Sequence, residues 1–150
     1  MDSWKTSMPS AGGGVLIVAR TLLHLDVADL GELVEELSEG FATATLDQFL
    51  STSGFPVGET AKYLRLSPAQ LAERRRARRL EPDESERLLR LAELFAHAME
   101  LFGDTTTSSR WLSSSAFGLG QKRPIEYAQT EWGASEVHDL IGRISDGSAM

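Results

Sequence analysis

The 150-residue sequence contains no cysteine. This absence excludes a disulfide framework, a thiolate zinc site and a cysteine nucleophile, and it favours a cytoplasmic protein. The longest purely apolar run is Val15 to Ala19, far short of the roughly 20 residues that a membrane span needs. The first residues also lack a basic start followed by a long apolar stretch. We therefore predict neither a signal peptide nor a membrane partner.

Patterns of catalytic residues are also scarce. The three histidines, His24, His97 and His138, are far apart in the sequence and do not have the spacing of metal ligands. Ser113 to Ser115 have no base nearby in the sequence. We therefore predict that the protein is not an enzyme and needs neither a cofactor nor a metal, although residues distant in sequence can still meet in the fold.

No stretch of the chain alternates apolar and polar residues as a half-buried strand does. Apolar residues instead recur at spacings of three and four from Leu22 to Leu37, from Leu46 to Leu50, from Leu88 to Phe102 and from Val137 to Ile144. Pro124 is expected to begin one further short helix. The sequence therefore predicts an all-α fold.

Two segments are expected to lack long helices. Residues 1–14 combine proline, glycine and serine with little apolar content, which indicates a flexible leader. Residues 103–124 are rich in threonine, serine and glycine and predict a loop, with Trp111, Leu112 and Phe117 as its apolar anchors.

The helix predicted around residues 88–102 has an unusually wide apolar face. Leu89, Leu94 and Leu101 extend this face beyond what a one-sided surface helix needs. The surplus can cover a second subunit, so we predict a homodimer.

Positive charge is concentrated in one window of an acidic chain. The formal net charge is −7, and residues 1–55 and 81–104 carry net charges of −6 and −5. Residues 56–80 instead hold seven basic and two acidic side chains, and residues 74–79 contain five arginines in six positions. A polyanion such as nucleic acid is expected to bind at this window or nowhere.

The same window has the pattern of a helix-turn-helix. Ala61 and Leu64 lie on one face of a short helix, and a tight turn follows. Ser67 can cap the next helix, with Pro68 at its first position and Gln70 completing a capping box. Two short helices joined by a tight turn, the second rich in arginine, are typical of this DNA-binding motif.

The arginine run has two interpretations. Arginines on a helix usually form a solvated face, but this run has few acidic neighbours, and like charges three or four residues apart weaken a helix by a few tenths of a kcal/mol per pair unless phosphates compensate. DNA binding is the interpretation we favour. If five cations each neutralise a phosphate, log K falls with log[salt] with a slope of roughly −4 to −5. The expected contacts are Arg74, Arg75 and Arg78 in the major groove, with Lys62 and Arg65 on the backbone.

Four segments, in this order, carry a resemblance to a known family: "YLRLSPAQLAERRR", "LEPDESERLLRLAELFAHAMELFG", "RWLSSSAFGLGQKRPIE" and "TEWGASEVHDLIGRI". With them the chain resembles, from about Leu46 through Ile144, the Xre/MbcA/ParS antitoxins, which are the partners of RES-domain toxins in type II toxin-antitoxin systems. Each segment is degenerate alone, but the four together in this order are specific.

The resemblance implies an Xre-like helix-turn-helix that binds the operator of its own operon, followed by a C-terminal toxin-binding domain, in a non-enzymatic dimer. It also implies that the RES toxin consumes NAD and that the antitoxin obstructs the toxin's active-site cleft. We accordingly expect a leader and N-terminal helices in residues 1–40, the helix-turn-helix domain in residues 41–82, and a dimerisation helix with the toxin-binding domain in residues 83–150.

The same resemblance assigns individual residues to each partner. The tail after Ile144 is short and polar, which does not favour a plug reaching far into a toxin pocket. The DNA-facing positions that the resemblance implies are Ser67, Gln70, Arg74, Arg75 and Arg76, and the toxin-facing ones are Arg110, Trp111, Lys122, Arg123 and Arg143.

Two alternatives share these observations. A stand-alone transcription regulator would have the arginine helix and the dimer but would bind no toxin. A protein-interaction module would use the arginine helix to hold an acidic partner and would not bind an operator even at low salt.

Overall fold

The computed structural model describes residues 11–147. These residues form helices, and within them only an isolated bridge between Ala42 and Arg79 has β geometry. The prediction of an all-α fold is therefore confirmed. The chain divides into two compact units between Glu93 and Leu94.

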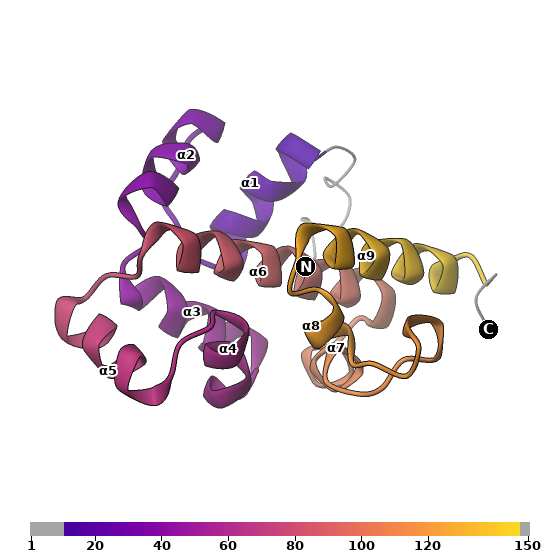
Figure 1. Cartoon of the computed structure of the whole chain (residues 1–150). Helices are drawn as coiled ribbons and strands as arrows, with labels where there is room; N and C mark the ends of the chain where they lie inside the picture. Colours follow the sequence, from indigo (N-terminus) through magenta and orange to yellow (C-terminus); the bar gives the residue numbers. More distant parts are fainter. Residues whose placement is uncertain (1–10, 148–150) are drawn as a thin grey trace. The chain divides into compact units, whose positions relative to one another are not determined.

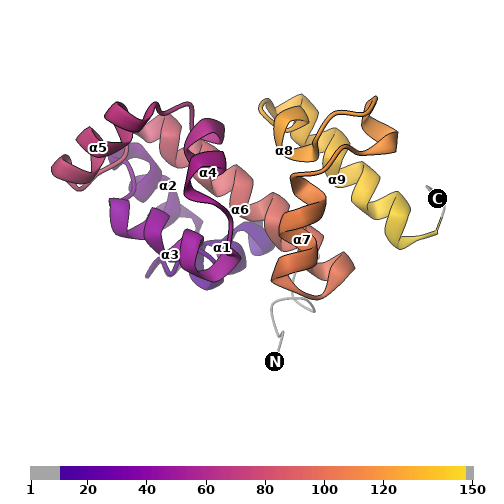
Figure 2. The same cartoon turned by 90° about the horizontal axis from the view of Figure 1, so that it is seen from below.

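The first unit holds the predicted helix-turn-helix. Figures 1 and 2 show α1 and α2 on one side of the start of α6, with α3, α4 and α5 on the other. Its core includes the fully buried side chains of Phe41, Phe49, Tyr63 and Leu88. The helices are α1 (Ala11–Thr21), α2 (Leu30–Glu39), α3 (Thr43–Ser53), α4 (Val57–Tyr63), α5 (Pro68–Ala77) and the first part of α6 (Pro82–Phe102).

The N-terminal part of this unit follows its local signals. Residues 1–10 of the expected leader lie outside the described residues, and residues 11–14 form the first turn of α1. Asp29 caps α2, because its side chain accepts a hydrogen bond of 2.9 Å from the Glu32 N–H. Gly40 ends α2 with a φ of 89°, and a Cβ there would collide with the Leu80 carbonyl oxygen. Glycine is therefore required where the two segments meet.

The second unit contains a helix that the sequence analysis missed. Residues 105–112, expected to belong to a loop, form α7 (Thr105–Leu112). The Asp104 side chain accepts a hydrogen bond of 2.7 Å from the Thr107 N–H, so an N-cap begins the helix despite its threonines and serines. After α7 come the 3-10 turn η2 (Phe117–Leu119), α8 (Pro124–Tyr127) and α9 (Glu131–Ser145), and α8 contacts both α7 and α9.

Helix α6 begins at Pro82 and buries most of its wide apolar face. Glu84 Oε1 accepts a hydrogen bond of 2.9 Å from the Glu81 N–H at the start of the helix. Leu89 and Leu94 are buried within the single chain. Leu101, the third residue of the widened face, is half-buried, and the homodimer stays a prediction.

Candidate functional site

The turn between α4 and α5 is held by its own backbone and by buried leucines. Arg65 has a φ of 64°, and its N–H donates to the Lys62 carbonyl at 3.0 Å. The Leu66 N–H donates to the Ala61 carbonyl at 2.9 Å. The side chains of Leu64 and Leu66 are buried on either side of Arg65. This arrangement sets the angle at which α5 leaves α4.

Helix α6 also stabilises this turn. Arg87 of α6 donates from Nη1 to the Leu64 carbonyl at 3.1 Å. The neighbouring Tyr63 side chain is 1% exposed, and its burial raises the pKa of the phenol to about 12. Tyr63 is therefore a neutral core residue at physiological pH.

The capping box predicted at the start of α5 is present. The Gln70 N–H donates to Ser67 Oγ at 3.1 Å, and the Ser67 N–H donates to Gln70 Oε1 at 2.9 Å. Both side chains are exposed. The Gln70 amide nitrogen keeps its two N–H donors, which is the group that reads a base edge. The cap therefore orders both residues without using up their hydrogen-bonding capacity.

Arg74 is the least available of the arginines. Its Nε and Nη2 donate to the two carboxylate oxygens of Glu84 at 2.9 and 2.8 Å. Glu84 is only 6% exposed, and its bond raises the pKa of Arg74 above the usual arginine value. This bidentate pair joins α5 to the start of α6.

The other arginines of the run differ in what they contact. Arg75 Nη1 lies 2.8 Å from Asp47 Oδ1 in an exposed ion pair, and Arg79 Nη1 donates to the Gly40 carbonyl at 2.6 Å. The guanidinium groups of Arg76 and Arg78 are exposed and have no partner among residues 11–147. Helix α5 itself buries no residue completely.

The structure thus brings the expected DNA-facing residues onto one short motif, with differing exposure. Arg74 is half-buried in its ion pair. The exposed members of the set are Lys62, Arg65, Ser67, Gln70, Arg75, Arg76 and Arg78.

The expected toxin-facing residues lie on three elements of the second unit. Arg110 is exposed on α7, Lys122 is exposed in the segment before α8, and Arg143 is exposed near the end of α9. A Cβ added to Gly118 would lie 2.9 Å from Leu140 Cδ1, so the segment that leads to Lys122 packs on α9 one turn before Arg143.

The remaining two members of this set are partly engaged. Trp111 is half-buried, with its ring 5.7 Å from that of Phe102 at an angle of 47°. Arg123 is half-buried as well, and its Nη2 lies 3.1 Å from Glu126 Oε2. Trp111 therefore acts at least in part as a core anchor of the second unit.

An exposed tryptophan at the start of α9 was missed by the sequence analysis. Trp132 is 86% exposed, the most exposed of the large apolar side chains that the structure describes. Three acidic residues of the same helix are also exposed. Glu131 precedes Trp132 directly, and Glu136 and Asp139 follow it by about one and two helical turns. The sequence signal that could have identified Trp132 is its position outside the apolar stripe of Val137, Leu140 and Ile141.

Two histidines that are distant in sequence meet in the second unit. His97 Nδ1 and His138 Nδ1 are 2.7 Å apart, and the rings stack with centroids 5.0 Å apart. One Nδ1–H must donate a hydrogen bond to the other, unprotonated Nδ1, so at least one of the two rings is neutral. Burial lowers the pKa of His97, and burial together with His97 lowers that of His138 to about 4. Among residues 11–147 no group of three possible metal ligands forms around them.

Within the described part of the chain, no helix has both the length and the apolar character needed to cross a membrane.

Comparison with known proteins assigns both units. A family model for the antitoxin Xre-like helix-turn-helix domain matches residues 32–93, and a model for the antitoxin Xre/MbcA/ParS C-terminal toxin-binding domain matches residues 97–147. The protein named antitoxin Xre from Yersinia enterocolitica is 35% identical over 118 residues, which are 77% of this chain and 79% of the relative. Antitoxins Xre from Photorhabdus laumondii and Pseudomonas putida are 31% and 26% identical, over 74% and 88% of this chain and 76% and 84% of their own lengths.

The fold and the cationic helix define a DNA-binding helix-turn-helix protein with a second helical domain that binds a toxin. The chain belongs to the Xre/MbcA/ParS family of antitoxins.

Proposed function

We propose that this antitoxin neutralises a RES-domain toxin that consumes NAD, and that it does so by binding the toxin and obstructing its active site. The observation that carries the proposal is the order of the two matched domains on one chain, a helix-turn-helix at residues 32–93 and a toxin-binding domain at residues 97–147. The four matching sequence segments support the RES class in particular. The antitoxin has no catalytic role of its own in this scheme.

The second activity in the proposal is repression of its own operon. Helix α5 enters the major groove, Ser67 and Gln70 face base edges, and Lys62, Arg65 and Arg75 contact phosphates. Arg76 and Arg78 complete the cationic surface. The exposed positions of these residues and the absence of internal partners for Arg76 and Arg78 within residues 11–147 support this assignment.

Arg74 has a different role in this proposal from the DNA contact expected from the sequence. Its bidentate pair with the buried Glu84 makes it a positioning residue that holds α5 on α6. Binding a phosphate would require Arg74 to leave a carboxylate that has little access to water, at a cost that an exposed arginine does not face.

We propose that the antitoxin is cytoplasmic and that it binds its operator as a homodimer. A helix-turn-helix dimer binds two half-sites about one helical turn apart, so the operator should be a palindrome. Sedimentation of the full chain, with and without a candidate operator, tests the dimer.

The toxin is proposed to bind across α7, the segment before α8, and α9. The cations Arg110, Lys122, Arg123 and Arg143 would form its polar part, and Trp111 would contribute the exposed edge of its indole. To these we add Trp132. A large exposed aromatic residue within a toxin-binding domain has the character of an interface hot spot. Its acidic neighbours suit a toxin surface with positive charge beside an apolar slot.

Co-expression tests the central claim. Expression of the neighbouring toxin gene alone should stop growth and deplete cellular NAD, and co-expression of the antitoxin should restore both. Growth arrest without NAD loss would exclude the RES class and leave the antitoxin role intact. Failure of the antitoxin to restore growth, with both proteins soluble in the lysate, would overturn the proposal and favour a stand-alone regulator.

A further inference from the structure

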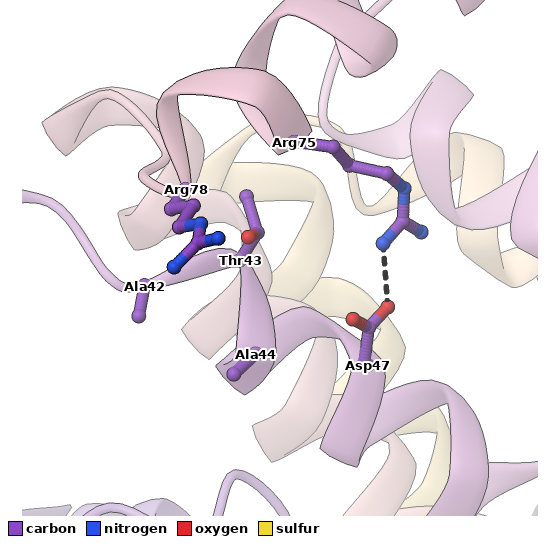
Figure 3. Close-up of a pocket in the computed structure, with 6 residues that line it drawn as sticks. All are labelled: Ala42, Thr43, Ala44, Asp47, Arg75 and Arg78. Carbon is purple, nitrogen blue, oxygen red and sulfur yellow. Dashed lines mark hydrogen bonds and ion pairs between the residues drawn. The ribbon is translucent and has the colours of Figure 1, made fainter.

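An open pocket of about 430 Å³ lies between the end of α5 and the beginning of α3. Two of its lining residues, Arg75 and Arg78, belong to the proposed DNA-facing set, whereas Thr43 and the start of α3 do not. Figure 3 shows Arg78 beside Thr43, and Arg75 on the other side of Thr43 with its guanidinium directed at Asp47. Its lining residues are Ala42, Thr43, Ala44, Asp47, Arg75 and Arg78.

The beginning of α3 presents one unused backbone donor to the pocket. The N-cap residue is Ala42, which has no side-chain acceptor for the first N–H groups of this 11-residue helix. The Ala44 N–H has no acceptor among the described residues. This free N–H and the helix dipole favour an anion at this end.

Thr43 supplies an independent indication of a ligand. It is only 8% exposed and lines the pocket, and its hydroxyl has no hydrogen-bond partner among residues 11–147. Figure 3 shows the side chain between Arg75 and Arg78. The Thr43 hydroxyl oxygen is not among the fully buried unpaired atoms of the described residues, so it is accessible and can bond to a molecule in the pocket or to water. Here the bound molecule would need oxygen atoms that accept hydrogen bonds.

Two guanidinium groups give the pocket its charge. The Arg78 guanidinium has no partner in the described part of the chain. The Arg78 backbone is fixed, with a φ of 62° and a carbonyl that accepts a hydrogen bond of 3.3 Å from the Thr43 N–H. Arg75 uses one N–H for Asp47 at 2.8 Å, which leaves the other donors of its guanidinium for a ligand. The Asp47 carboxylate repels an anion, so the ligand is expected on the side of Arg78 and Thr43.

We propose that this pocket binds a phosphate group. Arg78, the Thr43 hydroxyl and the Ala44 N–H would each bond to one phosphate oxygen, with Arg75 shared between Asp47 and the ligand. Several donors from different directions suit a tetrahedral phosphate better than a planar carboxylate. The phosphate can belong to a DNA backbone or to a small phosphorylated molecule, and the chemistry of recognition is the same for both.

Titration of the full ¹⁵N-labelled chain with inorganic phosphate, against sodium chloride at equal ionic strength, tests the proposal. Saturable shifts of the Thr43 and Ala44 amides are expected in the wild type. Arg78→Gln should weaken phosphate binding by about tenfold or more, because a charge-assisted hydrogen bond is lost. Arg76→Gln is the matched control, since it removes one charge from the same run outside the pocket and should leave the phosphate titration unchanged.

A second pair of variants tests the threonine. Thr43→Val keeps the shape of the side chain and should weaken phosphate binding, whereas Thr43→Ser should retain it. Circular dichroism of each variant separates loss of binding from loss of fold. The proposal is overturned if the two amides do not shift in a folded wild-type chain, or if Arg78→Gln and Arg76→Gln give equal titrations.

Addition of an operator duplex distinguishes the two sources. If the duplex displaces phosphate, and Arg78→Gln also lowers the salt dependence of DNA binding, the pocket holds a backbone phosphate. If duplex and phosphate bind together, the pocket serves a free phosphorylated ligand. The phosphate titration contains no DNA, so failure of operator binding would count against the proposed function and not against this site.

Discussion

The guanidinium of Arg74 forms two parallel hydrogen bonds, of 2.9 and 2.8 Å, with the carboxylate of Glu84. One partner belongs to the arginine-rich helix α5 and the other to the first turn of α6. Glu84 also accepts a bond from the Glu81 N–H, so a single buried carboxylate caps α6 and holds α5. The cationic helix is therefore positioned by one of its own cations.

Replacement of Arg74 should lower the stability of the fold more than it changes the number of DNA phosphates that the protein neutralises. Arg74→Ala leaves the nearly buried Glu84 carboxylate unpaired and should lower the free energy of unfolding by about 2 to 4 kcal/mol. The slope of log K for DNA against log[salt] should stay that of the wild type at a temperature where the variant is folded. Urea unfolding and fluorescence anisotropy measure the two effects. A variant of normal stability with a slope reduced by one phosphate would show that Arg74 contacts DNA.

Replacement of Arg76 should have the opposite effect. Arg76→Gln removes an exposed cation with no partner among residues 11–147. Stability should change by less than about 0.5 kcal/mol, and the salt slope should become shallower by about 0.9. Anisotropy titrations between low and moderate salt measure the slope. Lys122→Gln, which removes a charge from the second unit, is the control, and an equal change in both variants would argue against a local DNA contact.

Trp132 provides a test of the toxin interface. Trp132→Ala should weaken toxin binding by about 30-fold or more, as expected for a hot spot worth at least about 2 kcal/mol, and should leave the unfolding free energy nearly unchanged because the side chain is 86% exposed. Calorimetry with purified toxin measures the affinity. Val34→Ala, at an exposed apolar residue of the first unit, should bind toxin normally. If the Trp132 variant binds toxin with wild-type affinity, the first turn of α9 is not part of the interface.

The histidine pair predicts a loss of stability in acid. The pKa of His138 falls from 6.5 to about 4 in the folded chain, through burial and the proximity of His97. Between these values the unfolded chain binds more protons than the folded one, so the stability present above about pH 6.5 declines as the pH falls towards 4. The loss due to this pair should reach about 1 to 3 kcal/mol. Urea unfolding of wild type and His138→Gln from pH 7 to about 4.5 measures it, and parallel curves would contradict the assignment.

Two glycines of α9 should respond oppositely to alanine. A Cβ at Gly133 would collide with the Tyr127 carbonyl oxygen, whereas a Cβ at Gly142 meets open space. Gly133→Ala should therefore lower the free energy of unfolding by about 2 kcal/mol or more, and Gly142→Ala should raise it by up to about 1 kcal/mol. Thermal unfolding compares them. Equal stability of the two variants would mean that α8 can move away from α9 at little cost.

Short-range patterns predicted much of the fold. The capping box of Ser67 and Gln70, the turn before it and the periodicity of α6 and α9 involve residues within a few positions of one another, so the sequence displays them directly. Helix α7 was missed because its threonines and serines favour loops, and the Asp104 cap that offsets this preference was not recognised.

The candidate sites were harder to predict, since their availability depends on distant partners. Five arginines in six positions are equivalent as a local pattern, but Arg74 meets Glu84, Arg79 meets the Gly40 carbonyl, and Arg76 meets no partner among residues 11–147. The sequence analysis named Trp111 and not Trp132, yet Trp111 packs on Phe102 while Trp132 is exposed.

The sequence by itself determined the helical class, the helix-turn-helix and the place where positive charge gathers, because helix periodicity, capping and net charge are properties of neighbouring residues. Only the tertiary structure decided which cations remain available, that Thr43 and Arg78 share a pocket, and that His97 lies against His138. Each of these depends on side chains brought together from separate helices, and no local pattern specifies such a meeting.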